Sequence, residues 1–215
     1  MTSREGNSPA WADFFAKDPS LEASRIEIVN AVELLDGVLR NGGRVLLCGN
    51  GGSAADCEHI AGELAKACAL ARPLPLGDRE ALFAAGDDGE LAEGLQQGLD
   101  VLPLVSQAAL LTAIVNDQSG DLIFAQQVVA YGRPGGVLWA LTTSGASANV
   151  VLALRTARAR GLHTISFTGP TGGAVESVSD VTVRLPGANV QEIQSSHQRV
   201  YHEICLDIER RWYGL

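Results

Sequence analysis

The stretch VLLCGNGGSAADCEHIAGEL, residues 45–64, contains the strongest indications of the fold. It begins with a short apolar run bounded by glycines, which predicts a buried strand. Three glycines and a serine within 49–53 separate this strand from a helix that we expect from about Ser53 to about Ala71. Glycine lets a backbone approach a ligand closely, and a helix N-terminus presents N–H groups to an anion. The stretch therefore predicts an anion-binding turn, with a tight turn that binds nothing as the alternative.

The alternation of strands and helices continues along the chain. We expect a short helix at 9–16 and a longer one from Ser20, as its N-cap, to the glycine pair at 42–43. Residues 102–117 fit a helix or a buried strand, while prolines and glycines break 72–100 into a loop with one or two short helices. Further strands are predicted at the start of 137–145, at 163–169 and at 181–185, and helices at 122–132, 147–161 and 189–212. This order predicts an α/β fold with a mainly parallel sheet and helices on both faces.

Composition indicates a globular protein and excludes several functions. The 215 residues are 46% hydrophobic and 19% charged, which suits one domain with a sizeable core. A net charge of −9 is opposite in sign to a nucleic-acid-binding surface, so we expect no nucleic-acid partner. No apolar stretch approaches the roughly 20 residues that span a bilayer, and residues 1–15 lack the apolar segment of a secretion signal. Four cysteines without CxxC spacing predict free thiols and a cytoplasmic location.

A second loop, TTSGAS at 142–147, repeats the design of the first. It places four hydroxyl side chains around Gly145 at the start of a helix. Ser147 could be only a helix cap, but four hydroxyls exceed what one cap needs. Ligands of parallel α/β sheets bind beyond the carboxyl ends of the strands, where both loops are expected. The two loops therefore predict a phosphate site built from backbone N–H groups and hydroxyls, without lysine or arginine.

Histidine and carboxylate side chains are spaced to face a common site. His59 and Glu63 are four residues apart, so they share one helix face and could bind a metal or form an acid–base pair. An exposed surface pair is the alternative. In the C-terminal helix, Gln194 and His202 are about two turns apart and face the same way, whereas His197 lies between them.

Six motifs follow one another in order: GNGGS at 49–53, His59 with Glu63, Asn116-Asp117, TTSGASAN at 142–149, FTG at 167–169 and IQSSHQRVYH at 193–202. This ordered set resembles the sugar isomerase (SIS) domain family, and within it the phosphoheptose isomerases. The resemblance implies a three-layer α/β/α sandwich with long N- and C-terminal helices. It implies a single SIS domain over residues 1–215, with N-terminal helices at 1–43, a sheet core at 44–188 and a C-terminal helix at 189–215.

The same resemblance implies a homotetramer with sites at subunit interfaces and a set of site residues. The cofactor would be a divalent metal, usually zinc, with ligands His59, Glu63, Gln194 and His202. The phosphate of a sugar phosphate would meet Ser53, Thr142, Thr143, Ser144 and Ser147. The rest of the sugar would meet Asn50, Gly51, Gly52, Asn116 and Asp117, together with Glu63 and Gln194. Glu63 and His202 would be the catalytic base and its acid–base partner.

Three departures from the family pattern affect the substrate more than the reaction. Either Gln191 or Gln194 could be the amide ligand, and Gln194 is chosen because only it has a histidine eight residues later. The family's arginine four residues after the metal glutamate is Ala67 here. The middle segment is also longer by some two dozen residues, within about 72–105.

The implied reaction is the aldose–ketose isomerisation of sedoheptulose 7-phosphate to D-glycero-D-manno-heptose 7-phosphate through an enediol. The departures keep a longer ketose phosphate open, such as an octulose 8-phosphate in antibiotic biosynthesis. Fold alone does not fix function, so a non-catalytic SIS scaffold that binds a replication-initiator protein is a further alternative, as is a phosphosugar-sensing regulator. A scaffold has no need of the complete set of four ligands.

Overall fold

The computed structural model describes residues 9–214. Residues 1–8, at the start of the N-terminal helical region expected over 1–43, and residue 215 lie outside the described residues. Within the described range, five parallel strands form one sheet in the order β2-β1-β3-β4-β5. They are β1 (Val45–Gly49), β2 (Val101–Pro103), β3 (Val137–Leu141), β4 (His163–Thr168) and β5 (Val181–Arg184).

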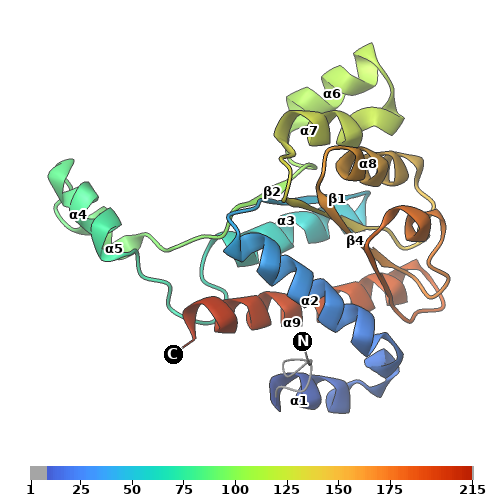
Figure 1. Cartoon of the computed structure of the whole chain (residues 1–215), viewed down its shortest axis with the longest axis horizontal. Helices are drawn as coiled ribbons and strands as arrows, with labels where there is room; N and C mark the ends of the chain where they lie inside the picture. The colour runs from blue at the N-terminus through green and yellow to red at the C-terminus, as the bar shows by residue number, and fades with distance from the viewer. Residues whose placement is uncertain (1–8, 215) are drawn as a thin grey trace.

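Helices cover both faces of this sheet (Figure 1). One face carries α2 (Arg25–Arg40), α3 (Gly52–Ala65) and α9 (Val190–Tyr213), with α1 (Pro9–Lys17) packed at its edge. The other face carries α7 (Ile123–Tyr131) and α8 (Ala148–Ala159), and α6 (Ala108–Asp117) lies against α7. Short 3-10 turns occur at η1 (Pro19–Ser24), η2 (Gly120–Leu122) and η3 (Ala174–Val178). The arrangement confirms the predicted three-layer α/β/α sandwich with long terminal helices.

Strands β1 and β3 are apolar throughout because each of their residues faces one of two covered surfaces. Along β1, Val45 and Leu47 enter the core under α2, α3 and α9, while Leu46 and Cys48 enter the core under α7 and α8. Every residue of β1 and β3 is buried. Strands of this kind read as continuous apolar runs rather than as alternating ones.

Two predicted helix boundaries are wrong. Ser20 is not the N-cap of α2, because Asp18 accepts the Ser20 N–H and begins the 3-10 turn η1, so that α2 starts only at Arg25. The helix after the glycine loop ends at Ala65 rather than near Ala71. It ends there because Lys66 takes an extended backbone and the following amides turn toward Glu209 on α9.

The ambiguous segment 102–117 contains both a strand and a helix. Val101–Pro103 forms β2, and Ala108–Asp117 forms α6. Pro103 is tolerated because β2 is an edge strand that pairs only with β1 within the described sheet. Among the described residues, no helix is long and apolar enough to span a membrane.

Residues 73–98 form an arm that projects from the body (Figure 1). The arm contains α4 (Leu76–Ala84) and α5 (Glu90–Gly94), and Ala92 is its single buried residue. Its two ends are joined by an isolated β-bridge between Pro73 and Gln96. The arm lies within the segment expected to be longer, and it leaves the sheet undisturbed.

Candidate functional site

The two predicted loops meet at the carboxyl edge of the sheet. Strands β1 and β3 are direct neighbours in parallel register, with Gly49 opposite Leu141, so the loops that follow them leave the sheet side by side. They enclose a pocket of about 290 Å³ together with the first turn of α9. The residues that line it are Asn50, Gly51, Gly52, Ser53, Leu141, Thr142, Thr143, Ser147, Val190 and Gln194.

Two glycines of the first loop shape this side of the pocket. Gly51 has φ +57°, in the left-handed region, where it begins α3 without any side-chain cap. A Cβ on Gly52 would lie 2.4 Å from the Gln194 amide nitrogen, so a larger residue at this position would displace the end of the Gln194 side chain. Gln194 is therefore held against the glycine loop at the pocket.

The second loop has hydroxyls that do not serve as helix caps. Ser147 occupies the N-cap position of α8 but makes no capping hydrogen bond, and its Oγ lies 3.5 Å from Thr142 Oγ1. The capping alternative for Ser147 therefore does not explain this serine. Ser144 differs, because its hydroxyl accepts the Ala146 N–H and the residue does not line the pocket.

A pair of amides joins the two loops. The side chains of Asn50 and Asn149 exchange two hydrogen bonds, each 2.9 Å long. Sequence reasoning assigned Asn50 to the substrate and gave Asn149 no role, although Asn149 was part of the TTSGASAN motif. The geometry makes Asn149 the partner that fixes the glycine loop relative to the hydroxyl loop.

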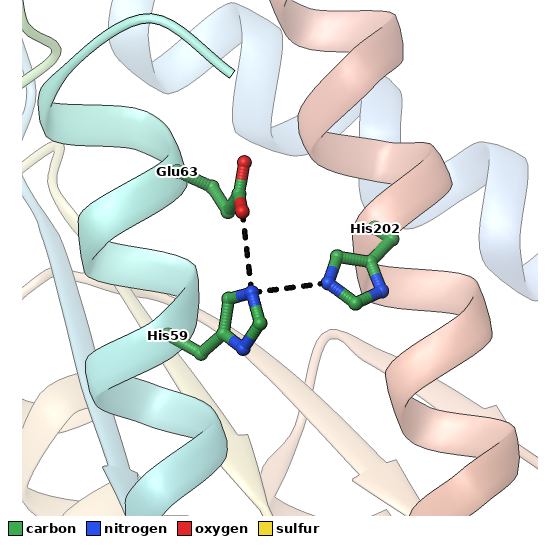
Figure 2. A group of neighbouring side chains, drawn as sticks. All are labelled: His59, Glu63 and His202. Atoms are coloured by element: carbon green, nitrogen blue, oxygen red, sulfur yellow. Dashed lines mark hydrogen bonds and ion pairs between the residues drawn. The ribbon is translucent and has the colours of Figure 1, made fainter. Parts of the chain in front are cut away.

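Two histidines and a glutamate converge between α3 and α9 (Figure 2). His59 Nε2 lies 3.2 Å from Glu63 Oε1 and 3.1 Å from His202 Nε2. All three ligand atoms lie within 4.8 Å of one another. Ligand atoms held about 2.0–2.1 Å from a tetrahedral zinc are separated by roughly 3.3 Å, so the observed spacing fits a metal site. Imidazole nitrogens and a carboxylate oxygen are also the donors that zinc accepts.

Gln194 lies in the first two turns of α9, against the glycine loop. It precedes His202 by two turns of α9, about 12 Å along the helix axis, and lines the pocket beside Gly52. The alternative Gln191 lies instead in a separate hollow with Ser195 and Arg199. Gln194, the residue chosen from the sequence, therefore lies at the loop pocket, and its role as a metal ligand stays a prediction.

The charges around the group are set by burial and by hydrogen bonds. Burial acts to raise the pKa of Glu63, but hydrogen bonds from Cys68 and His59 outweigh it and hold that pKa below its ordinary value. Burial, followed by the charge of His59, lowers the pKa of His202. Both shifts favour an ionised Glu63 and a neutral His202 near pH 7, which are the forms that bind metals and accept protons.

Sequence reasoning missed two side chains that support the histidines. The Tyr201 hydroxyl donates to Asp56 Oδ1 at 3.1 Å, which links α9 to α3 one turn before His59. The Tyr201 ring lies 5.7 Å from the ring of His59 and 4.7 Å from that of His202. A carboxylate three residues before His59 was the available signal for Asp56.

Several residues singled out in the sequence lie apart from this group. His197 is fully buried, with Nε2 3.2 Å from the carbonyl oxygen of Thr168 at the end of β4. Asn116 and Asp117 end α6, where the Asn116 amide donates to Asp117 at 2.7 Å, and they do not line the pocket. Their assignment to the substrate stays a prediction. At the position of the missing arginine, Ala67 donates its N–H to Gln96.

The sequence matches the SIS domain family over residues 19–97 and 89–169. A phosphoheptose isomerase of Roseiflexus sp. (strain RS-1) is 36% identical over 199 residues, which cover 93% of this chain and 89% of the relative. One of Rhodospirillum rubrum is 39% identical over 183 residues, covering 85% and 84% of the two chains. The solved structure of phosphoheptose isomerase from Neisseria gonorrhoeae is 34% identical, with a TM-score of 0.71 and coverage of 92% of this chain and 94% of that one.

The α/β/α sandwich, the ordered loops and these similarities define the class of protein: the chain belongs to the SIS domain family. Within that family its relatives over most of its length are isomerases. The chain is accordingly an enzyme, a phosphosugar isomerase.

Proposed function

We propose that the enzyme interconverts sedoheptulose 7-phosphate and D-glycero-D-manno-heptose 7-phosphate through an enediol intermediate. One observation carries this proposal: the loop pocket and the His59–Glu63–His202 group lie along the same two helices, α3 and α9. A phosphosugar is a ligand with an anionic end and a reactive carbonyl end, which match the two halves of the site. The names of the relatives support a heptose phosphate.

The loop pocket binds the phosphate group. It offers the hydroxyls of Ser53, Thr142 and Ser147 and the N-terminal ends of α3 and α8. Positive helix ends and hydroxyl donors hold an anion without a basic side chain. Binding energy from this remote group positions C1 and C2 of the sugar at the other half of the site.

The His59–Glu63–His202 group performs the proton transfers. Glu63, whose pKa is low, is ionised and takes the proton from one of the two carbons. His202 is the acid–base partner that carries the second proton. Zinc held by His59, Glu63, Gln194 and His202 would, when bound, polarise the sugar carbonyl and stabilise the enediolate oxygen. The isomerisation moves hydrogen within one molecule, so it needs no external oxidant or reductant.

A homotetramer with sites between subunits completes the proposal. Asn116 and Asp117 lie outside the pocket of their own chain, and this placement supports a role at the site of a neighbouring subunit. The complete His59–Glu63–His202 group argues against a scaffold without catalysis.

The test is turnover of sedoheptulose 7-phosphate by protein treated with chelator, with and without added zinc. We expect zinc-dependent formation of an aldoheptose 7-phosphate and a loss of at least about 10³-fold in kcat for Glu63→Gln and for His202→Ala. Glu93→Gln, the same change in the arm, is the matched control. Turnover by both site variants at the wild-type rate would refute the assignment. An octulose 8-phosphate tested in parallel distinguishes the longer substrate.

A further inference from the structure

Helices α3 and α9 run side by side in the same direction, and each supplies ligands of the proposed centre (Figure 2). Three contacts follow one another along their seam: Gly52 with Gln194, Asp56 with Tyr201, and His59 with His202. The residue numbers of the partners increase along both helices, so the two helices are parallel. A slide of one helix along the other would therefore disrupt all three contacts at once. The relative position of the two helices therefore sets whether the ligand atoms converge.

A buried ion pair lies at the end of this line of contacts, beyond His59 and His202. Arg72 Nε lies 2.8 Å from Glu209 Oε1, and both side chains are 0% exposed. Glu209 belongs to α9, two turns after His202. Its carboxylate also accepts the backbone N–H groups of Cys68, Ala69 and Leu70, at 2.8, 2.8 and 3.0 Å.

The remaining nitrogens of Arg72 bind the end of α3. Nη1 donates to the carbonyl of Leu64 at 2.9 Å, and Nη2 donates to the carbonyl of Glu63 at 3.1 Å. Carbonyl groups in the last turn of a helix lack partners within the helix, and Arg72 satisfies two of them. One planar guanidinium thus joins the backbone of Glu63 itself to the carboxylate of Glu209.

The loop held by Glu209 also reaches the Glu63 side chain. Cys68, whose N–H is bound by Glu209, hydrogen-bonds through its thiol to the Glu63 carboxylate. Both ends of Glu63, its carbonyl and its carboxylate, are therefore fixed by partners of the same ion pair. A fully buried ion pair is weak evidence for a gain in stability, because desolvation offsets much of the attraction. The geometry of the ion pair indicates a different role, because the pair fixes the end of α3, the helix that carries His59 and Glu63.

We propose that Arg72 and Glu209 are positioning residues that hold α3 in register against α9, so that His59, Glu63 and His202 converge on one point. The inference rests on the proposed function, in which these three side chains form the metal and catalytic centre. Neither positioning residue touches the substrate.

The experiment compares Arg72→Lys, Arg72→Met and Glu209→Gln with the wild type in three measurements. These are zinc affinity of chelator-treated protein by competition with a chromogenic chelator, kcat and KM for sedoheptulose 7-phosphate, and urea unfolding. Lysine keeps the charge but cannot reach Glu209 and two carbonyls at once. We expect zinc affinity and kcat to fall about 10- to 100-fold, as for residues that orient metal ligands, with KM within about 3-fold because the phosphate pocket lies at the opposite end of α3.

Leu154→Ala is the matched control for general loosening. Leu154 is fully buried in α8 on the other face of the sheet, so its truncation destabilises the fold without touching α3 or α9. Zinc affinity should survive this change. If Leu154→Ala lowers zinc affinity as much as the Arg72 variants do at equal stability, positioning is refuted. It is also refuted if folded Arg72→Lys and Glu209→Gln both bind zinc and turn over like the wild type.

Failure of the proposed function is distinguishable from failure of this inference. A wild-type protein that neither binds zinc nor turns over the sugar phosphate contradicts the proposed function. Wild-type activity together with unchanged variants contradicts only the positioning role. Should Arg72→Met not fold, Glu209→Gln keeps the shape of the side chain and carries the comparison.

Discussion

The carboxyl edge of the sheet and the arm at residues 73–98 are both built outside the strands, yet different forces hold them in place. At the edge, a Cβ on Gly145 would lie 1.7 Å from the carbonyl oxygen of Gly172, so the loop after β3 and the loop after β4 are in backbone contact. In the arm, a Cβ on Gly77 would meet nothing within 4 Å. The arm helices depend on local hydrogen bonds, such as those from Leu91 and Ala92 to Asp87. Tertiary packing determines the site, whereas local hydrogen bonds determine the arm.

The largest expected contrast comes from one substitution made in both regions. Gly145→Ala places a Cβ at φ +64° and into the backbone of Gly172. Strain and overpacking together should lower the free energy of unfolding by about 3 kcal/mol or more. Gly77→Ala removes a glycine from an exposed helix and should raise that free energy by about 0.5 kcal/mol. Urea unfolding of both variants checks the pair, and equal effects would contradict the comparison.

A change of pH should have an effect at the carboxyl edge that is similar in size to that of Gly145→Ala. His197 is buried behind this edge, and its titration changes the free energy of unfolding. Burial lowers the pKa of His197 to about 4, from 6.5. Between these values the unfolded chain binds one more proton than the folded chain, so the free energy of unfolding falls as the pH falls. Over the whole window this loss amounts to about 3 kcal/mol.

His197→Gln removes the titrating group and keeps a donor for the carbonyl of Thr168. Its free energy of unfolding should therefore decrease less than that of the wild type between pH 7 and pH 4. Urea unfolding of metal-free protein at several pH values measures the difference. Parallel curves for the two proteins would show that His197 is not the group responsible.

Removing the arm should have the smallest effect. Pro73 and Gln96 are already paired, so two glycines in place of residues 74–95 close the chain as a short hairpin. Because the arm buries only Ala92 among its residues, the free energy of unfolding should change by no more than about 1 kcal/mol. Thermal and urea unfolding check this expectation. A loss of several kcal/mol would instead show that the arm is covered in the assembled protein.

The sequence predicted those features of the site whose residues are close together in the chain. The glycine loop at 49–53 and the pair His59 and Glu63 could be recognised because a turn and a helix face are local patterns. The apolar runs of β1 and β3 predicted buried parallel strands for the same reason. Through the family resemblance, the order of the motifs then predicted that Gln194 and His202 belong to the same site.

The features that sequence reasoning missed depend on pairs of distant residues. Arg72 and Glu209 are separated by 137 positions, and nothing near either residue indicates the other. The end of α3 at Ala65 was mispredicted for this reason, because the chain turns where Glu209 binds its amides. Asn50 with Asn149, and Asp56 with Tyr201, are further pairs of this kind.

The parallel seam of α3 and α9 has a consequence for how chain length can vary in this protein. One residue inserted between Gln194 and His202 would turn His202 by about 100° around the helix and shift it by about 1.5 Å. Helices α3 and α9 can therefore exchange side chains away from the seam, but they cannot gain or lose a residue without separating His59, Glu63 and His202. The arm is anchored by paired ends outside the sheet, so its length is free of that restriction. Differences in length between this chain and other SIS domains are expected to collect there, where they leave the spacing of His59, Glu63 and His202 unchanged.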